Sequence, residues 1–393
     1  MPSSESYGRA YCHRVQVLKS ICFVVTTPFA VNAFLLTHLK ALADCCSVTL
    51  CVNRSLYPLS EQIDSRIRVV DFKIAREVSV FMDLRAFLFL VSFFHAEKFS
   101  AVHSITPKAG LLAMLAARLA GIRLRHHTFT GQVWANRSGI ARYVLKAFDR
   151  MIVHSASQVF ADSPSQCRFL DNESVVKSGE ISILGPGSIS GVDLSRFRPE
   201  TEVCHQVRAE LGTAGDVCVF LSVGRLTRDK GVFDLVEAFT TVAGINPCVE
   251  LWLVGPDEEC LFEQIEQQKQ HGPGRMRWLG QTFHPERYMA SADVLVLPSY
   301  REGFGSVVIE AAACAIPTVA YRIDGVIDAV VEDRTGLLVE VGNVEALAAA
   351  MLRVSLDCAG RHRLGSQALD RVSKEFSSAI VTAEWRAFYE RVL

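Results

Sequence analysis

The stretch VLVLPSYREGFGSVVIEAAACAIPTVAY, residues 294–321, decides the fold of this chain. A β-branched run leads into a turn with two glycines, then into apolar residues at helical spacing that end before Pro317. A second strand-like run, PTVAY, follows directly. A strand, helix and strand in close succession predict one unit of a helix-covered parallel sheet.

The same alternation extends outward from this unit over nearly the whole chain, which predicts an α/β fold. In the first half we expect strands near residues 21–26, 48–52, 67–72, 101–105, 125–131, 158–163 and 181–185. In the second half we expect them near 217–224, 249–255, 276–280, 294–299, 317–321 and 335–340. Helical patterns lie between most of these runs, for instance over residues 107–120.

The segment GPGSISGVDLSRFRPE, residues 185–200, combines glycines and prolines without a sustained period, which is typical of a linker. We therefore expect two sequential Rossmann-like domains, 1–190 and 191–375, and a C-terminal helix, 376–393, that packs back toward the first domain. Open parallel sheets bind ligands beyond the carboxyl ends of their strands, so the cleft between the domains is the expected site.

Composition fits a globular enzyme, because half of the 393 residues are hydrophobic and 21% are charged. The net charge of -1 indicates no nucleic-acid partner. Residues 1–190 nevertheless hold 21 Lys and Arg against 13 Asp and Glu, while the rest hold 20 against 29. This asymmetry fits a basic face for an anionic membrane or acceptor, and it equally fits two ordinary surfaces.

The 12 cysteines lack metal-ligand spacing, which favours reduced thiols in a cytoplasmic protein. The first 17 residues are polar, so we expect no secretory signal. The apolar run AFLFLVSFF, residues 86–94, is too short to cross a bilayer, which takes about 20 helical residues. It is either a buried helix face or an interfacial anchor.

A basic turn, SVGRLTRDKG at residues 222–231, follows one predicted strand and precedes a helix. Backbone N–H groups at a helix start, together with Arg225, Arg228 and Lys230, suit a phosphate or diphosphate. The alternative is a solvated turn in which Asp229 pairs with these cations.

Two glutamates flank the Gly-Phe-Gly turn, Glu302 in the loop and Glu310 on the helix. Gly303 and Gly305 permit a close backbone approach to a ligand. Separated carboxylates can accept hydrogen bonds from the hydroxyls of two different sugar rings. The alternative is two surface carboxylates in solvent, although the apolar helix SVVIEAAACAI indicates partial burial of Glu310.

The motif GRLTRDKG, followed by SYREGFGSVVIEAAACAIPTVAYRIDGVIDAVVEDRTGLLV, resembles the donor-binding domain of the retaining glycosyltransferases of family 4, over about residues 215–355. The spacing from Glu302 to Glu310 matches that family's signature. In the first half, HTFTGQVWANRSGIARYVLKAFDR and FADSPSQCRFL are similar to the subgroup that assembles bacterial capsular and O-antigen polysaccharides.

The resemblance implies the glycosyltransferase B fold, in which two Rossmann-like domains face each other across a cleft. The first domain would bind the acceptor and the second a nucleotide-diphosphate sugar, with no metal or other cofactor. The residues so implied for the donor are Gly224, Arg225 and Lys230 at the diphosphate, Glu302 at the sugar, the backbone of Gly303, Phe304 and Gly305, and Glu310 at the ribose.

The chain departs from the family's pattern in two places. The segment after the first strand, VVTTPFAVNAF, lacks the usual glycines, and Thr130 occupies a position where many members have a histidine. By strand alternation His127 and Thr130 lie on opposite faces. We expect Thr130 and Gly131 at the cleft, Gln132 beside them on the acceptor side, and His127 as the weaker catalytic candidate.

The sequence thus predicts a retaining, metal-independent hexosyltransferase with Glu302, Arg225 and Lys230 as its central residues. It would move a sugar, with UDP the expected carrier, to a glycan or polyprenyl-diphosphate-linked acceptor in cell-surface polysaccharide synthesis. We expect it in the cytoplasm, contacting the inner membrane through the basic first half. The alternatives are a nucleotide-sugar epimerase and an inactive nucleotide-sugar binding protein.

Overall fold

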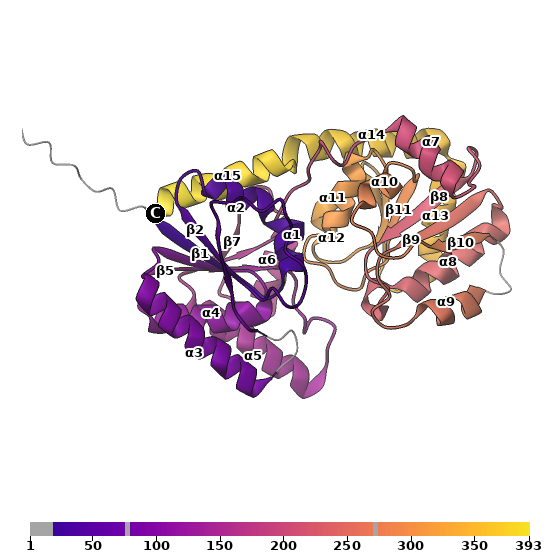
Figure 1. The fold of residues 1–393 in the computed structure, drawn as a ribbon. Helices are drawn as coiled ribbons and strands as arrows, with labels where there is room; N and C mark the ends of the chain where they lie inside the picture. Colours follow the sequence, from indigo (N-terminus) through magenta and orange to yellow (C-terminus); the bar gives the residue numbers. More distant parts are fainter. Residues whose placement is uncertain (1–18, 75–78, 270–273) are drawn as a thin grey trace, which may run out of the picture.

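The computed structural model describes residues 19–74, 79–269 and 274–393, and across these ranges the chain forms two α/β domains (Figure 1). The polar segment 1–17, which carried the expectation about a secretory signal, lies outside the described residues. Each domain is built on one parallel sheet with helices on both faces. The predicted fold class is confirmed.

The first sheet has the strand order β3-β2-β1-β4-β5-β6-β7, and its strands pair in parallel. The order reverses between β1 and β4, which is where doubly wound sheets bind ligands beyond their strand ends. The strands are β1 (Ser20–Val25), β2 (Ser47–Val52), β3 (Arg68–Asp71), β4 (Ala101–Ser104), β5 (Leu124–Phe129), β6 (Gln158–Ala161) and β7 (Ile181–Ile183).

Successive residues of β1 serve opposite faces of this sheet, as the strand pleat requires. Cys22 and Val24 pack with α3, α4 and α5, while Ile21, Phe23 and Val25 pack with α1, α2 and α15. The helices of this half are α1 (Pro28–Phe34), α2 (Leu36–Leu42), α3 (Val80–Glu97), α4 (Pro107–Leu119), α5 (Gly139–Ser155) and α6 (Pro164–Asn172).

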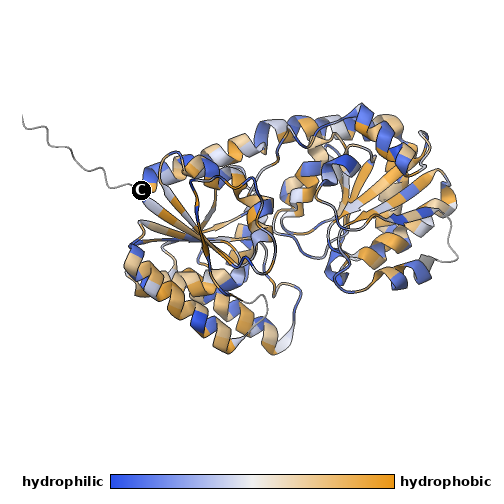
Figure 2. Ribbon diagram, viewed as in Figure 1, coloured by the Kyte–Doolittle hydropathy of each residue, from blue (hydrophilic) through white to orange (hydrophobic). Residues whose placement is uncertain are grey.

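The second sheet repeats the scheme with the order β10-β9-β8-β11-β12-β13. Figure 2 shows its strands, like those of the first sheet, as mainly hydrophobic, which is typical of parallel strands buried on both faces. The strands are β8 (Cys218–Val223), β9 (Val249–Val254), β10 (Arg275–Trp278), β11 (Val294–Leu297), β12 (Thr318–Tyr321) and β13 (Gly336–Val339).

Helices α8 and α13 pack on one face of this sheet, and α7, α10, α11, α12 and α14 on the other. Apart from the 3-10 turn η1 (Arg228–Lys230), the helices are α7 (Thr201–Glu210), α8 (Val232–Ile245), α9 (Phe262–Lys269), α10 (Pro285–Met289), α11 (Ser306–Ala313), α12 (Val326–Ala329), α13 (Val344–Leu356), α14 (Cys358–Glu375) and α15 (Ser378–Val392).

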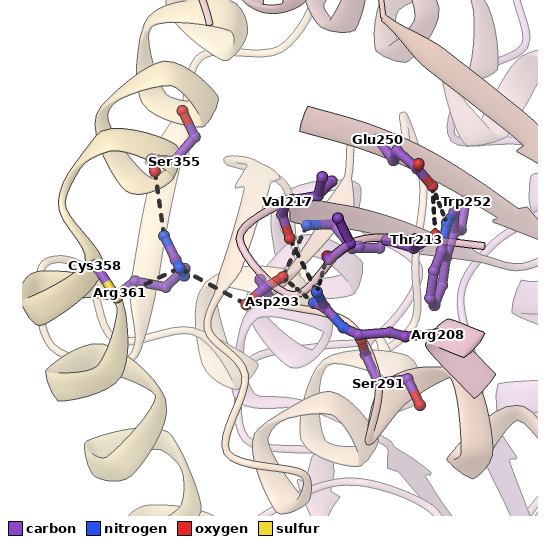
Figure 3. Close-up of polar contacts among 12 residues, drawn as sticks. Arg208, Thr213, Val217, Glu250, Trp252, Ser291, Asp293, Ser355, Cys358 and Arg361 are labelled. Carbon is purple, nitrogen blue, oxygen red and sulfur yellow. Dashed lines mark hydrogen bonds and ion pairs between the residues drawn. The ribbon is translucent and has the colours of Figure 1, made fainter. Parts of the chain in front are cut away.

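A polar network holds the amino-terminal end of β11 in the second domain (Figure 3). Asp293 accepts from Arg208 at 2.5 Å and from the Val219 N–H at 2.8 Å, and Arg361 lies 3.7 Å from its other oxygen. Arg208 comes from α7 and Arg361 from α14, so one carboxylate ties two helices to the sheet. The network lies at the strand ends opposite those that bind ligands, so its role is structural.

The last helices connect the two domains. α14 packs on α11 in the second domain, and α15 packs on α2 in the first, so together they run along one side of the molecule (Figure 1). At the crossing, Val192 of the linker pairs with Ser377. The C-terminal helix therefore lies against the first domain, the position expected from the sequence.

Residues 86–94 belong to α3, which buries Ala86, Leu90 and Phe94 and leaves Leu88 and Phe89 exposed. This apolar run thus packs against the core with one side of the helix and exposes apolar residues on the other side. Across the described part of the chain, no helix has both the length and the apolar character that a membrane span needs.

Candidate active site

The basic turn after β8 is held against the loop after β11. Gly231, which has a left-handed backbone with φ of 67°, lies so close to Pro298 that an added Cβ would fall 2.0 Å from its carbonyl oxygen. The Tyr300 N–H donates to the Asp229 carbonyl at 2.9 Å, and Arg301 lies 3.2 Å from the Asp229 carboxylate. The predicted phosphate turn and the predicted sugar loop therefore form one unit.

Lys230 and Glu302 meet in this unit, with the Lys230 Nζ 2.5 Å from the Glu302 Oε1. Both side chains are partly buried, so the pair is shielded from solvent more than a surface ion pair is. Arg225 lies in the same turn and pairs with Glu258 at 2.9 Å. One cation of the predicted diphosphate site, Lys230, thus contacts the predicted sugar-binding carboxylate, and Arg225 lies in the same turn.

Gly303 lies where the two domains come closest. An added Cβ at this position would fall 2.3 Å from the Asp162 Oδ2 and 2.6 Å from the Thr130 carbonyl oxygen, and a Cβ added at Gly131 would fall 3.1 Å from the Gly303 nitrogen. Because Asp162, Thr130 and Gly131 belong to the first domain, only a glycine fits between them and Glu302.

Phe304 contributes packing at this point. Its side chain is buried and contacts Phe376, with ring centroids 5.2 Å apart, which leaves its backbone for the predicted donor contact. Gly305 adopts a left-handed conformation, φ 76°, and begins α11. Gly224, at the end of β8, approaches Gly255 so closely that an added Cβ on Gly255 would fall 1.8 Å from the Gly224 oxygen.

Glu310 lies on α11 toward α10, away from the Lys230–Glu302 pair. Its pKa is raised to about 7, mainly by burial, with Arg196 lowering it and Glu286 raising it. A half-buried carboxyl of this kind can hold neighbouring hydroxyls at neutral pH in either protonation state.

Thr130, Gly131 and Gln132 follow β5 directly in the first domain. Gly131 has φ of 95° and faces the Gly303 backbone. Gln132 is buried, and neither of its amide atoms has a hydrogen-bond partner among the residues that the structure describes. An unpaired buried amide beside Gly131 is available to a ligand.

His127, the weaker catalytic candidate, lies inside the first domain. Its ring is fully buried, lies 2.8 Å from the Ser104 Oγ through Nδ1, and contacts α4 at Gly110. Burial lowers its pKa to about 3, so it stays neutral. His126 points to the opposite face, against Phe388 of α15. Strand alternation separated the two rings correctly, but both faces of β5 are covered.

Sequence reasoning missed the start of α6, which contacts the second domain directly. Ser163 caps α6 and donates to the Gly303 carbonyl at 3.1 Å, and Gln166 donates to the Glu302 carbonyl at 3.1 Å. The Ser165 Oγ accepts from the Gly325 N–H at 2.6 Å. The sequence shows the capping signature Ser-Pro-Ser-Gln after a strand. It does not show which loop of the second domain this helix start contacts.

Asp162 is a further residue beside the site that the sequence did not reveal. Burial, together with the neighbouring carboxylates of Glu302 and Asp328, raises the pKa of its carboxyl to about 8. Its Oδ1 has no hydrogen-bond partner within the described ranges, although its Oδ2 lies against Gly303. A neutral, buried carboxyl beside Glu302 can donate a hydrogen bond at neutral pH.

Comparison with known proteins agrees with this geometry. Residues 205–371 match the family model for glycosyl transferases group 1, and residues 31–187 match the glycosyl transferase 4-like domain. Alpha-maltose-1-phosphate synthase of Mycolicibacterium smegmatis is 30% identical over 321 residues, which cover 76% of this chain and 80% of that protein. The chain belongs to the glycosyl transferases group 1 family.

Two further relatives of this glycosyltransferase have names that state a pathway or a reaction. The capsular polysaccharide biosynthesis glycosyltransferase CapM of Staphylococcus aureus is 29% identical over 335 residues, 85% of this chain and 87% of that protein. The UDP-Gal:alpha-D-GlcNAc-diphosphoundecaprenol alpha-1,3-galactosyltransferase of Escherichia coli is 25% identical over 307 residues, 76% and 78% of the two chains.

Solved structures show the same fold. The sucrose-phosphate synthase of Thermosynechococcus elongatus superposes with a TM-score of 0.80 at 23% identity, over 95% of this chain and 99% of that one. Anabaena HepE in complex with UDP-glucose superposes with a TM-score of 0.78 at 19% identity, over 95% and 99%. The glycosyltransferase therefore has the predicted B-type fold, with Lys230 and Glu302 at the junction of its domains.

Proposed function

We propose that this glycosyltransferase moves a hexosyl or N-acetylhexosaminyl group from a UDP-sugar to a glycan or lipid-linked acceptor in cell-surface polysaccharide synthesis. The observation that carries the proposal is the Lys230–Glu302 pair, which joins the diphosphate turn to the sugar loop at 2.5 Å. The capsular relative, the UDP-Gal-dependent relative and the neighbour in complex with UDP-glucose support the donor and acceptor classes.

In this proposal, Arg225 and Lys230 hold the donor diphosphate. Charge develops on the departing diphosphate as the glycosidic bond breaks, and preorganised cations stabilise that charge in the transition state. Glu302 accepts hydrogen bonds from the hydroxyls of the transferred sugar, and Glu310 accepts those of the ribose. The unpaired Gln132 amide lies on the acceptor side.

We propose further that transfer retains the anomeric configuration and needs no metal. The two cations of the turn supply positive charge where a metal would otherwise act, and front-face attack, with the donor phosphate accepting the acceptor's proton, needs no protein nucleophile. Product anomericity by NMR and activity in excess chelator test these two statements separately.

Peripheral contact with the cytoplasmic face of the inner membrane completes the proposal. A polyprenyl-diphosphate acceptor would reside in that membrane, and the first half carries 21 Lys and Arg against 13 Asp and Glu. Transfer to a membrane acceptor should then weaken as salt rises, while hydrolysis of the donor alone changes little. Equal salt dependence of both reactions would contradict the membrane part.

A panel of nucleotide sugars tests the function, with thermal shift to find the donor and product analysis to find the reaction. We expect a UDP-sugar to raise the melting temperature, and acceptor extracts to accelerate UDP release. A donor converted to its epimer without acceptor would support an epimerase instead. Donor binding that survives Glu302→Ala, with no turnover on any acceptor, would indicate an inactive binding protein.

A further inference from the structure

Helix α5 carries its apolar stripe on the side that faces away from the protein. Ile140, Val144, Phe148 and Met151 are spaced by three or four residues, so they lie on one side of the helix, and all are exposed. Ile140 is 82% exposed, and Tyr143 beside it is 74% exposed. A helix of a water-surrounded domain normally turns such a stripe inward.

The inward side of α5 combines apolar contacts to the domain core with a set of polar contacts. Arg142 and Lys146 pair with Glu173 at 2.8 Å and 2.7 Å, and both cations lie over the Trp134 ring. Asp149 is buried and accepts from the Trp134 indole at 2.6 Å. These contacts hold α5 in its orientation, so the outward apolar stripe is a built feature of the domain.

Helix α3 adds apolar residues on the same side of the first domain. Phe81, Leu84 and Leu88 are exposed, Phe81 to 77%, and Figure 2 shows most of α3 as hydrophobic. Both α3 and α5 pack on α4, and the three helices cover the sheet face opposite α15 (Figure 1). Grouped apolar residues of this kind on a surface mark an interaction site.

The charge of the same segment has one sign. From Lys98 to Phe148, which spans α4 and most of α5, the sequence has eight Lys and Arg and no Asp or Glu: Lys98, Lys108, Arg118, Arg123, Arg125, Arg137, Arg142 and Lys146. Some of these cations are paired with acids from elsewhere, but the segment adds no negative charge of its own. An exposed apolar stripe on a segment with net positive charge suits an anionic bilayer surface.

The stripe begins beside the active site. Asn136, just before α5, donates to the Tyr300 carbonyl of the donor loop at 3.2 Å, and Gln132 lies at the start of the same segment. A bilayer in contact with the stripe would therefore bring a membrane-embedded acceptor near Gln132 on the acceptor side of the active site.

We propose that the outer face of α5, extended by Phe81, Leu84 and Leu88 of α3, is the surface on which this enzyme docks to a bilayer of anionic lipids. The inference rests on the proposed function, because a lipid-linked acceptor gives the enzyme a reason to bind a membrane. A second copy of the chain is a poorer occupant, since two-fold pairing would bring the same cations together.

Vesicle sedimentation without donor or acceptor tests the surface. The double variant I140N/V144N changes exposed residues of the stripe, and I245N/L356N changes two exposed apolar residues of the second domain as a matched control. On vesicles of equal parts phosphatidylglycerol and phosphatidylcholine, we expect I140N/V144N to lower the partition coefficient by about tenfold or more. The control should match the wild type, and pure phosphatidylcholine should bind all three proteins weakly.

The proposal would be overturned if both double variants lost vesicle binding equally, or if I140N/V144N bound vesicles as well as the wild type. It would also be overturned if phosphatidylglycerol did not increase the binding of the wild type. A dimer that I140N/V144N converts to a monomer, with vesicle binding unchanged, would assign the face to a second copy and also overturn it. The thermal shift caused by a nucleotide sugar, measured on the same variants, reports on the donor site. Failure of the membrane surface is therefore distinguishable from failure of the proposed function.

Discussion

At the scale of single residues, Glu302 and Glu310 have different surroundings and should serve different parts of the donor. Glu302 pairs with Lys230 at 2.5 Å and lies against the first domain, whereas Glu310 lies toward α10 with its pKa raised to about 7 by burial. The first arrangement suits a contact that strengthens during bond cleavage. The second suits a ground-state contact to the nucleotide.

We therefore expect Glu302→Gln to lower kcat by about 100-fold with little change in the affinity for free UDP, because one charged transition-state contact is worth this much. Glu310→Gln should weaken UDP binding by about tenfold, the loss expected for a hydrogen bond to a charged group. Steady-state kinetics and calorimetric titration with UDP measure the two effects. The reversed pattern would contradict the assignment of the two glutamates.

Sequence patterns revealed Glu302, Lys230 and Gly303 because they lie in local motifs after strands. Asp162 was not found, because its raised pKa depends on burial by a domain that is distant in sequence. His127 was proposed because it lies near the position where many family members have a histidine, and strand alternation does not report what covers its face. The covering residues come from α4 and α5, which no local pattern near β5 specifies.

At the scale of elements, the predicted strands all form near their expected positions, and the central ones such as β1, β9 and β11 are nearly continuous apolar runs, as buried parallel strands are. The loops could not be predicted in this way. Their conformation depends on contacts between the domains, such as that of Gly303 with Thr130 and Asp162. The linker composition showed where the domains separate, but not which loops meet.

The start of α6 is the element that holds the Glu302 loop in place. Gln166 donates to the Glu302 carbonyl and does not contact the proposed sugar position itself, so we treat it as a positioning residue. Gln166→Ala should lower kcat about tenfold, since loss of a single neutral hydrogen bond costs about 1 kcal/mol and misplaces a catalytic group. The affinity for UDP should change little.

Gln206→Ala is the matched control, because Gln206 donates to Glu210 on the exposed helix α7, in the outer part of the second domain. Gln166→Glu gives a further readout, since it retains the side-chain shape but loses the donor. If Gln166→Ala and Gln206→Ala have the same kcat, the contact between α6 and the Glu302 loop has no positioning role.

At the scale of the whole molecule, α15 ties the end of the chain to the first domain through buried aromatic and imidazole rings. The Trp385 ring stacks on the rings of His38 and His103, with centroids 4.9 Å and 5.0 Å apart. The Tyr389 hydroxyl forms a hydrogen bond of 2.6 Å with the His103 Nδ1. Since α14 belongs to the second domain, these contacts help to set the relation between the domains on which the active site depends.

The histidines under α15 should make the folded molecule sensitive to acid. Burial lowers the pKa of His38 to about 4, below the value of about 6.5 expected in the unfolded chain. Between these two values the unfolded state binds the extra proton, so stability is full above about pH 6.5 and falls as the pH drops toward 4. His38 should contribute up to about 1.4 kcal/mol per pH unit to this loss.

His38→Gln removes the titrating ring and keeps an amide that can hydrogen-bond near the Ile189 carbonyl, the partner of the imidazole. Urea unfolding, followed by tryptophan fluorescence between about pH 7 and pH 5, should show the variant less stable than the wild type at the upper end. The difference in unfolding free energy should shrink toward pH 5, because only the wild type loses stability by keeping His38 neutral in the folded state. A difference that stays constant with pH would show that His38 titrates alike in the folded and unfolded chains.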